Sequence, residues 1–173
     1  MKIKFRYFLT QLFLLSMPLF FSADIMAAEP APAAKPKDNV IKVVYHADFA
    51  DARRFSTMLT NINNMVAVYQ ENLADYDIRI VFVSYGIRFV TKDPLAKTPF
   101  AEDAELKKRR ENLLGRLETL RESYGVKFEL CGITREQAGL EVKKLIPGVD
   151  VVRSGVVRIE ELQHQGFAYL KIE

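Results

Sequence analysis

The segment GVKFELCGIT, residues 125–134, decides how this chain folds and holds its single cysteine. The run VKFELC predicts a buried strand, and Gly125 in front of it is typical of the end of a helix. After Cys131 the strand pattern stops, and TREQAGL, residues 134–140, predicts a short helix. Cys131 is therefore expected at the point where a strand turns into a helix.

Four further segments predict strands. VIKVVYHA (40–47) and IRIVFVS (78–84) are β-branched and apolar nearly throughout. VDVV (149–152) is a short strand, and FAYLKI (167–172) is the last one. Continuous apolar strands of this kind are typical of a parallel sheet that is covered on both faces.

Helical segments alternate with these strands. Apolar residues recur at helical spacing over residues 55–69, after Asp48 or Asp51, either of which can cap the helix. A longer helix is expected over residues 102–124, and a shorter one over residues 154–166. This alternation predicts an α/β domain, a three-layer sandwich with a mostly parallel five-stranded sheet and right-handed crossovers.

In sheets of this kind, ligands bind beyond the carboxyl ends of the strands. The polar residues and glycines that follow the strands are therefore the candidate site. They are His46 after the first strand, Tyr85 after the second, Cys131, Gly132 and Thr134 at the third, and Ser154 after the fourth.

Cys131 has two interpretations. A free cysteine is most often a small buried apolar group, so a structural role is the first. The second is a reactive thiolate, because a thiol at a helix N-terminus is close to the positive end of the helix dipole. Gly132 allows close approach of the backbone, whose amides could hold an anion.

A cysteine that hydrolyses a substrate also needs a neighbouring base. His46 could serve only if the first and third strands are neighbours, as in a flavodoxin-like strand order. The alternative for His46 is a strand-end histidine with local hydrogen bonds. A cysteine hydrolase is therefore the weakest of the catalytic interpretations.

Several cofactor classes find no support in the sequence. One cysteine cannot form a disulfide within the chain, and the two histidines, His46 and His164, stand apart from other metal-ligating residues. The chain contains neither GxGxxG nor GK[ST], so it has no glycine-rich phosphate loop. We expect no metal site and no nucleotide cofactor.

The first 28 residues have the layout of a secretory signal peptide. A positive start (Lys2, Lys4, Arg6) precedes an apolar run over residues 8–21. That run is shorter than the ~20 apolar residues of a spanning helix, so we expect cleavage near Ala28 and no stable membrane anchor. Residues 29–39, rich in Ala, Pro and Lys, are typical of a flexible linker to a domain over residues 40–173.

The mature domain is expected to be nearly neutral. Removal of 28 of the 173 residues leaves 145 and takes away three positive charges and one negative charge, so the formal net charge falls from +3 to +1. Such a balance gives no electrostatic reason to expect a nucleic acid partner.

Four motifs carry a resemblance to a known family over about residues 41–172. They are VVYHAD followed by a helix with NINNM, then IRIVFVSYGIRFV, YGVKFELCGIT with AGL, and PGVDVVRSGVVRIEELQHQGFAYLKI. The last two are the more specific. With these motifs the chain resembles the DsrE/DsrF-like family, sulfur-relay proteins of flavodoxin-like (DsrEFH-like) α/β fold.

The resemblance implies a function. In this family a cysteine after the third strand, here Cys131, can accept sulfur as a persulfide and pass it on by thiol exchange. We therefore expect a periplasmic sulfur carrier or sulfurtransferase with protein donors and acceptors of sulfur. His46, Tyr85 and Thr134 are the expected pocket neighbours. The alternative is a non-catalytic oligomeric module that binds a small ligand or a protein tail, with Cys131 as a structural residue.

The resemblance also implies a homo-oligomer, a trimer or a hexamer. The helix over residues 55–69 adds a modest reason, because it has more apolar residues than one face requires. These residues are Phe55, Met58, Leu59, Ile62, Met65, Val66, Val68 and Tyr69.

Export with cleavage near Ala28 is the first testable prediction. N-terminal sequencing of the protein isolated from the cell envelope should give a chain that begins close to Glu29, because the apolar run ends just before the change in composition there. Recovery of full-length protein from the cytoplasm would contradict both the cleavage and the periplasmic location.

Overall fold

The structure, a computed structural model, describes residues 40–173. The predicted signal peptide (1–28) and linker (29–39) lie outside the described residues, so both stay predictions. Among the helices that the structure describes, none is both long enough and apolar enough to cross a membrane.

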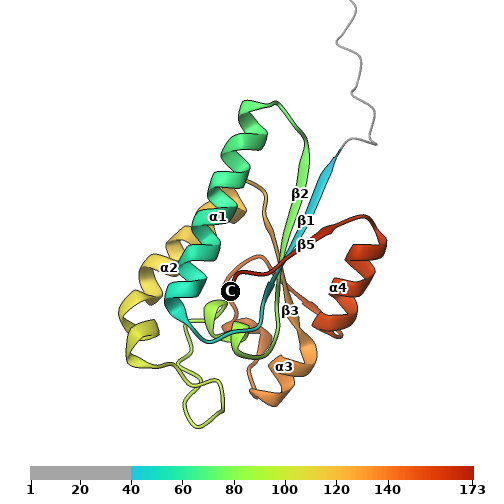
Figure 1. The fold of residues 1–173 in the computed structure, drawn as a ribbon. Coiled ribbons are helices and arrows are strands. Elements are labelled where there is room, and N and C mark those ends of the chain that lie inside the picture. Colours follow the sequence, from blue (N-terminus) through green and yellow to red (C-terminus); the bar gives the residue numbers. More distant parts are fainter. Residues whose placement is uncertain (1–39) are drawn as a thin grey trace, which may run out of the picture. The chain divides into compact units, whose positions relative to one another are not determined.

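Strands and helices alternate along the described chain (Figure 1). The strands are β1 (Ile41–Ala47), β2 (Tyr76–Phe82), β3 (Lys127–Cys131), β4 (Val149–Val152) and β5 (Ala168–Leu170). The helices are α1 (Ala52–Glu71), α2 (Ala104–Glu122), α3 (Gly132–Gln137) and α4 (Gly155–His164), with short 3-10 helices η2 (Ser84–Phe89) and η3 (Val142–Lys144). The second strand ends at Phe82, earlier than predicted, because Ser84 has a positive φ of 51° and already belongs to η2.

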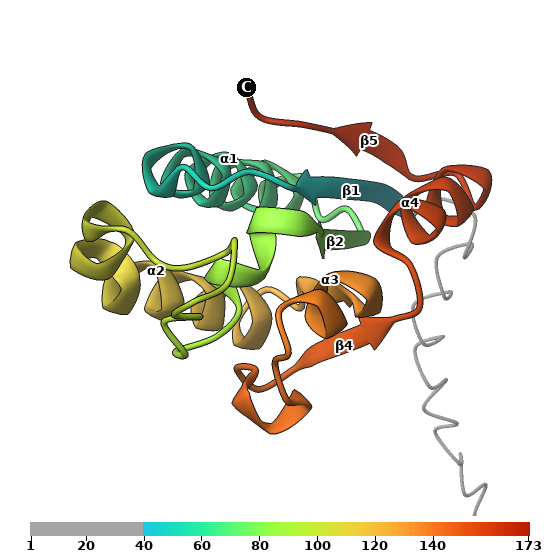
Figure 2. The ribbon, with the colours of Figure 1, turned by 90° about the horizontal axis from the view of Figure 1, so that it is seen from below.

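The strands of residues 40–173 form one five-stranded sheet in the order β4-β3-β2-β1-β5. Every ladder is parallel, with His46 opposite Val81 and Cys131 opposite Val152. Figure 2 shows β5 beside β1 at one edge of the sheet. β4 forms the other edge, beyond β2. The predicted α/β fold with a mostly parallel five-stranded sheet is confirmed.

The first and third strands are not neighbours, so the condition under which His46 could serve as a base for Cys131 is not met. β2 lies between β1 and β3 in the sheet. β2, β3 and β4 are added one after another in the same direction along the sheet, by connections through α1, through η2 with α2, and through α3. Only the connection through α4 leads back, and it places β5 on the other side of β1. His46 and Cys131 are therefore separated by two strand spacings, roughly 10 Å.

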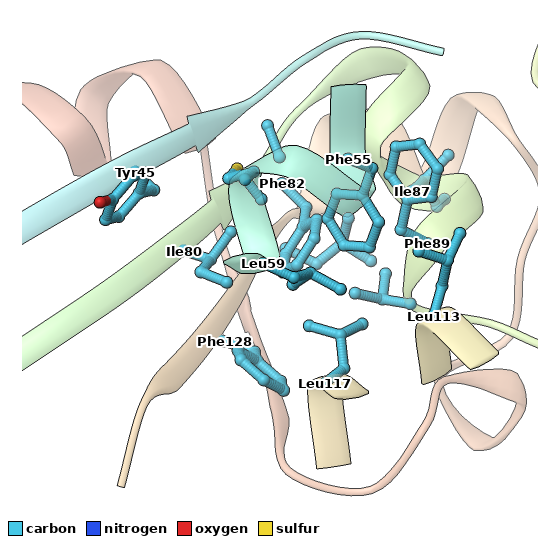
Figure 3. Packing of buried hydrophobic residues seen from close by; sticks show 14 of the residues in the cluster. Tyr45, Phe55, Leu59, Ile80, Phe82, Ile87, Phe89, Leu113, Leu117 and Phe128 are labelled. Carbon is cyan, nitrogen blue, oxygen red and sulfur yellow. The ribbon is translucent and has the colours of Figure 1, made fainter. Parts of the chain in front are cut away.

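Two apolar layers cover the sheet. α1 and α2 lie on one side and α4 on the other (Figure 1). On the α1–α2 side, Phe55, Phe82 and Leu117 belong to a large buried cluster, and Figure 3 shows them close together. The cluster on the α4 side is much smaller and consists of Val44, Val81, Ile159, Leu162 and Phe167. Alternate residues of each strand thus face opposite layers.

The many apolar residues of α1 are accounted for by packing within a single chain. Phe55, Met58, Leu59, Ile62 and Val66 are all buried in the large cluster. Of the remaining three apolar residues, Met65 and Tyr69 pack against that cluster and only Val68 is exposed. The composition of α1 therefore gives no independent reason for an oligomer, which remains a prediction from the family resemblance.

Gly86 offers a test of how tightly the carboxyl edge of the sheet is packed. A Cβ atom at this position would lie 2.0 Å from the carbonyl oxygen of Ala47, whereas one on Gly115 in α2 would meet nothing within 4 Å. We expect Gly86→Ala to lower the free energy of unfolding by about 3 kcal/mol, because the backbone at the end of β1 must move.

The matched control is Gly115→Ala, which should raise the free energy of unfolding by about 0.5–1 kcal/mol, since alanine favours an exposed helix interior. Urea unfolding of both variants measures the difference. Equal stability of Gly86→Ala and the wild type would contradict the close approach of η2 to β1.

Candidate functional site

Cys131 is the last residue of β3 and directly precedes α3. The residue is 4% exposed. Because Cys131 is two residues after Glu129, which pairs with Arg158 of α4, the side chains of both residues lie on the α4 side of the sheet. The thiol is therefore held at the carboxyl edge of the sheet, below the start of α4.

Glycines allow the backbone to close around this thiol. A Cβ atom on Gly155, the first residue of α4, would lie 3.0 Å from Cys131 Cβ and 2.5 Å from Val83 Cγ2. A Cβ atom on Gly132 would lie 2.9 Å from the carbonyl oxygen of Val152. Only glycine at both positions lets β3, β4 and α4 meet at the cysteine without displacement.

The surroundings of Cys131 favour its thiolate. Burial by itself raises the pKa of the thiol. The backbone N–H groups of Gly155, Thr134 and Ile133, together with the Thr134 hydroxyl, outweigh burial and hold the pKa below its ordinary value. Cys131 is the N-cap residue of α3, and its side chain makes no capping hydrogen bond.

Thr134 and Ser154 complete the surroundings of the cysteine. Thr134 is 4% exposed, and its Oγ1 accepts a hydrogen bond of 3.0 Å from the backbone N–H of Ser84. Ser154 is the N-cap residue of α4 but its hydroxyl makes no capping bond. Of the candidate residues, the structure thus gathers Cys131, Gly132, Thr134 and Ser154 at the ends of β3 and β4.

His46 belongs to a separate cluster at the ends of β1 and β5. Its Nδ1 lies 3.0 Å from the Tyr169 hydroxyl, and its Nε2 lies 4.0 Å from Asp48, which binds Lys171 at 2.9 Å. Burial lowers the pKa of His46, and the charge of Asp48 only partly opposes this effect. The imidazole is therefore neutral at pH 7 and engaged locally, as the second interpretation of this residue proposed.

Tyr85 also lies apart from this group. It is in η2, 40% exposed, and its ring packs edge-on against Phe100 at 5.7 Å between centroids. His164, the other histidine, is at the far end of α4, roughly 14 Å from Gly155 by helical rise, and pairs with Glu160 at 2.7 Å. Neither histidine is placed as a base for Cys131, so the arrangement does not support a cysteine hydrolase.

Glu129 is the functional neighbour that sequence analysis missed. Its side chain is 6% exposed and lies between Arg79 of β2, at 2.8 Å, and Arg158 of α4, at 2.7 Å. Burial raises the pKa of this carboxyl, but hydrogen bonds from both arginines outweigh it and hold the pKa below its ordinary value. An acidic residue between Phe128 and Leu130, in the middle of a predicted strand, was the signal in the sequence.

A cleft of about 680 Å³ adjoins this ion pair. Its lining comes from β2, β3, β4 and the first turns of α4: Arg79, Glu129, Asp150, Val152, Arg153, Ser154, Val157, Arg158 and Glu161. The lining carries three arginines and three carboxylates, so the charges balance. Within residues 40–173 no group of three or more His, Cys, Asp or Glu side chains is placed to hold a metal ion.

Comparison with known proteins identifies the family. The model of the DsrE/DsrF-like family matches residues 39–172, which is most of the chain. The chain belongs to the DsrE/DsrF-like family. The family resemblance drawn from the motifs around Cys131 is thereby confirmed.

An uncharacterized protein of Aquifex aeolicus (strain VF5) is 28% identical over 130 residues, which is 75% of this chain and 55% of that protein. The chain thus spans about half the length of that relative.

Two solved structures are similar to parts of this chain. The protein of unknown function MTH1491 from Methanobacterium thermoautotrophicum has a TM-score of 0.58 and 29% identity, over 76% of this chain and 98% of that one. The ychN protein from E. coli has a TM-score of 0.47 and 19% identity, over 77% and 100%.

Removal of the Glu129 charge should destabilise the fold. Glu129→Gln leaves Arg79 and Arg158 without their shared carboxylate, and we expect a loss of about 2–4 kcal/mol at pH 7. Because the folded pKa lies below the ordinary glutamate value, this stabilisation is present above about pH 4.5 and is lost as the pH falls toward the folded pKa. Urea unfolding between pH 3 and pH 7 measures both effects.

Glu161→Gln is the matched control. Glu161 also pairs with Arg158 but is 50% exposed, so we expect a change within about 0.5 kcal/mol. If Glu129→Gln proved as stable as the control at pH 7, or if its deficit relative to the wild type did not shrink in acid, the ion pair would not hold α4 on the sheet.

Proposed function

We propose that this DsrE/DsrF-like protein handles sulfane sulfur, with Cys131 as the residue that carries it as a persulfide. The observation that supports this most is the set of N–H and O–H groups of Gly155, Ile133 and Thr134 around one thiol, which lowers its pKa. Thiolate is the nucleophilic form of cysteine, and a lowered pKa raises its fraction near neutral pH.

Transfer of a sulfur atom from a donor to Cys131 requires no external oxidant or reductant. The Cys131 thiolate attacks the outer sulfur of a donor persulfide, R–S–SH. A sulfur–sulfur bond forms to Cys131, the donor bond breaks, and the donor leaves as the thiolate R–S⁻. Attack by an acceptor thiolate on the outer sulfur of Cys131–S–SH then releases Cys131 as a thiolate again.

Burial of the thiol favours a second candidate. Cys131 is 4% exposed, which is also what a structural cysteine requires. In that case the protein is a non-catalytic module, and the cleft beside Arg153 and Arg158 binds a small ligand or a protein tail. Tyr85 and His46 lie away from Cys131, so in either case the proposed site consists of Cys131, Gly132, Thr134 and Ser154.

The cellular location and the oligomeric state of the protein are also part of the proposal. The layout of residues 1–28 supports action in the periplasm, and family membership supports a homo-oligomer, a trimer or a hexamer. The mass of the mature chain in solution, from light scattering at micromolar concentration, tests the assembly. A strict monomer would refute it and would confine the site to residues of one chain.

Sulfur loading tests the main proposal. The mature protein is incubated with polysulfide, and its intact mass is measured before and after reductant. We expect a species heavier by one sulfur atom that disappears on reduction. Because the chain has one cysteine, Cys131→Ser should abolish this species completely.

The opposite result supports the binding module. A thiol that stays unmodified in the folded protein, yet gains sulfur once the protein is denatured, would show that Cys131 is structural. Near-neutral alkylation of the same samples serves as the control for thiol access.

A further inference from the structure

We propose that the cleft beside Cys131 binds the zwitterionic head of a free amino acid: Arg153 binds its carboxylate and Asp150 its ammonium group. The sulfur donor is then a small amino-acid persulfide, such as cysteine persulfide. This donor class rests on the proposed function, whereas binding of the zwitterion can be measured without any sulfur transfer.

One half of the sheet face below α4 is open. Of the described strands, only β1 and β2 contribute to the small buried cluster that α4 covers, through Val44 and Val81. The other half, with Glu129 of β3 and Asp150 of β4, lines the cleft of about 680 Å³. Parallel sheets are normally covered on both faces, and a cleft of this volume is within the range of small-molecule sites. The opening is therefore large enough for a ligand of amino-acid size.

The buried charges that line the cleft are already paired. Arg79 donates two hydrogen bonds to Asp77 and one to Glu129. Arg158 donates two hydrogen bonds to Glu129 and one to Glu161. Every nitrogen of both guanidinium groups thus faces a carboxylate, and neither arginine offers a free cation to a ligand.

Two charges of the lining have no partner within the protein. Among residues 40–173, the side chains of Asp150 and Arg153 make no hydrogen bond or ion pair, and both residues are exposed. They have opposite charges and lie three residues apart, roughly 10 Å by the rise of an extended chain.

A ligand that binds both side chains must carry a positive and a negative group close together. A guanidinium binds a carboxylate through two parallel hydrogen bonds, and an aspartate accepts hydrogen bonds from an ammonium group. The head of a free amino acid has both groups on one carbon atom. The main chain of a protein C-terminus and an inorganic anion offer only the negative group, so they match the cleft less well.

Strand register places such a ligand next to Cys131. In the ladder between β3 and β4, Asp150 is opposite Glu129. Val152 is likewise opposite Cys131, and residues in register share one face of the sheet. An amino acid held between Asp150 and Arg153 would lie over Val152, one strand spacing or roughly 5 Å from the backbone of Cys131. Because a cysteine side chain is short, the outer sulfur of a bound cysteine persulfide stays within reach of the thiolate.

Sulfur transfer from this donor keeps atoms and electrons in balance. The Cys131 thiolate attacks the outer sulfur of cysteine persulfide, whose proton stays on that sulfur. A sulfur–sulfur bond to Cys131 forms as the bond within the donor breaks, and free cysteine leaves as its thiolate.

Donors that lack one charge test the two contacts separately. The mature protein is loaded from L-cysteine persulfide, from the persulfide of N-acetyl-L-cysteine, which has no ammonium group, and from that of L-cysteine methyl ester, which has no carboxylate. Intact mass against time gives each rate. We expect the wild type to load from cysteine persulfide about tenfold faster than from either derivative, since a hydrogen bond to a charged group has an effect of this order.

Two variants should each affect a different pair of donors. Arg153→Gln should slow loading from cysteine persulfide about tenfold but loading from the methyl ester less than about twofold, because that donor has no carboxylate to bind. Asp150→Asn should show the same contrast between cysteine persulfide and the N-acetyl derivative. Arg153→Lys keeps the charge and should retain most of the rate. Lys108→Gln, which removes an exposed charge from α2, is the matched control.

Equal loading of the wild type from the three donors would overturn the proposal. So would a reduction in Arg153→Gln that is the same for every donor, because a general loss of positive charge or of structure would then explain it. A reduction of equal size in Lys108→Gln would have the same meaning.

A binding measurement separates this proposal from the sulfur function. S-methyl-L-cysteine has the same head but no transferable sulfur, and it should shift the amide resonances of residues 150–153 in the wild type but not in Arg153→Gln. If polysulfide does not load Cys131 but these shifts occur, the sulfur function is wrong and the amino-acid site stands. If polysulfide loads Cys131 but S-methyl-L-cysteine causes no shift, the sulfur function stands and the amino-acid site is refuted.

Discussion

The carboxylate of Glu129, held between Arg79 and Arg158, is the interaction on which the candidate site depends. α4 has only a small apolar cluster with which to pack on the sheet. The ion pair from Glu129 to Arg158 adds a directional contact between β3 and the first turn of this helix. Both arginines keep the carboxylate ionised, so the pair stays charged, and the helix that it ties to β3 begins beside Cys131.

Strand topology explains why this point is a site at all. α3 follows β3, and Ala138 and Leu140, which come just after α3, join the large cluster with α1 and α2. α4 follows β4 and covers the opposite face. The connections after the neighbouring strands β3 and β4 therefore run to opposite faces of the sheet. Where this happens, a crevice opens at the strand ends, and α/β proteins bind ligands there. Cys131 lies at that crevice, and the cleft along Val152, Arg153 and Ser154 adjoins it.

The chemistry of Cys131 results from opposing effects of one environment. Close packing by Gly132 and Gly155 removes water from the thiol, which disfavours the charged form. The same packing brings backbone N–H groups to the sulfur, and these favour the charged form. The second effect is the larger, and the Thr134 hydroxyl adds to it. A thiol that is buried and yet prone to ionise is consistent with a carrier that protects its sulfur between donor and acceptor.

The fold class and the strand end that carries Cys131 could both be read from local sequence patterns. Continuous β-branched runs and helical periodicity are local properties, so the parallel sheet and a turn from strand to helix after Cys131 could be predicted without knowledge of contacts. The family followed from the motifs around that turn. The order of the strands could not be predicted, because it depends on which side of the sheet each crossover takes, and β2 separates His46 from Cys131 as a result. The partners of Glu129 were equally hidden: Arg79 and Arg158 are 50 and 29 residues away in the chain. Such pairs are visible only in the tertiary structure, because a buried charged side chain in a strand is stable where folding brings an oppositely charged side chain beside it.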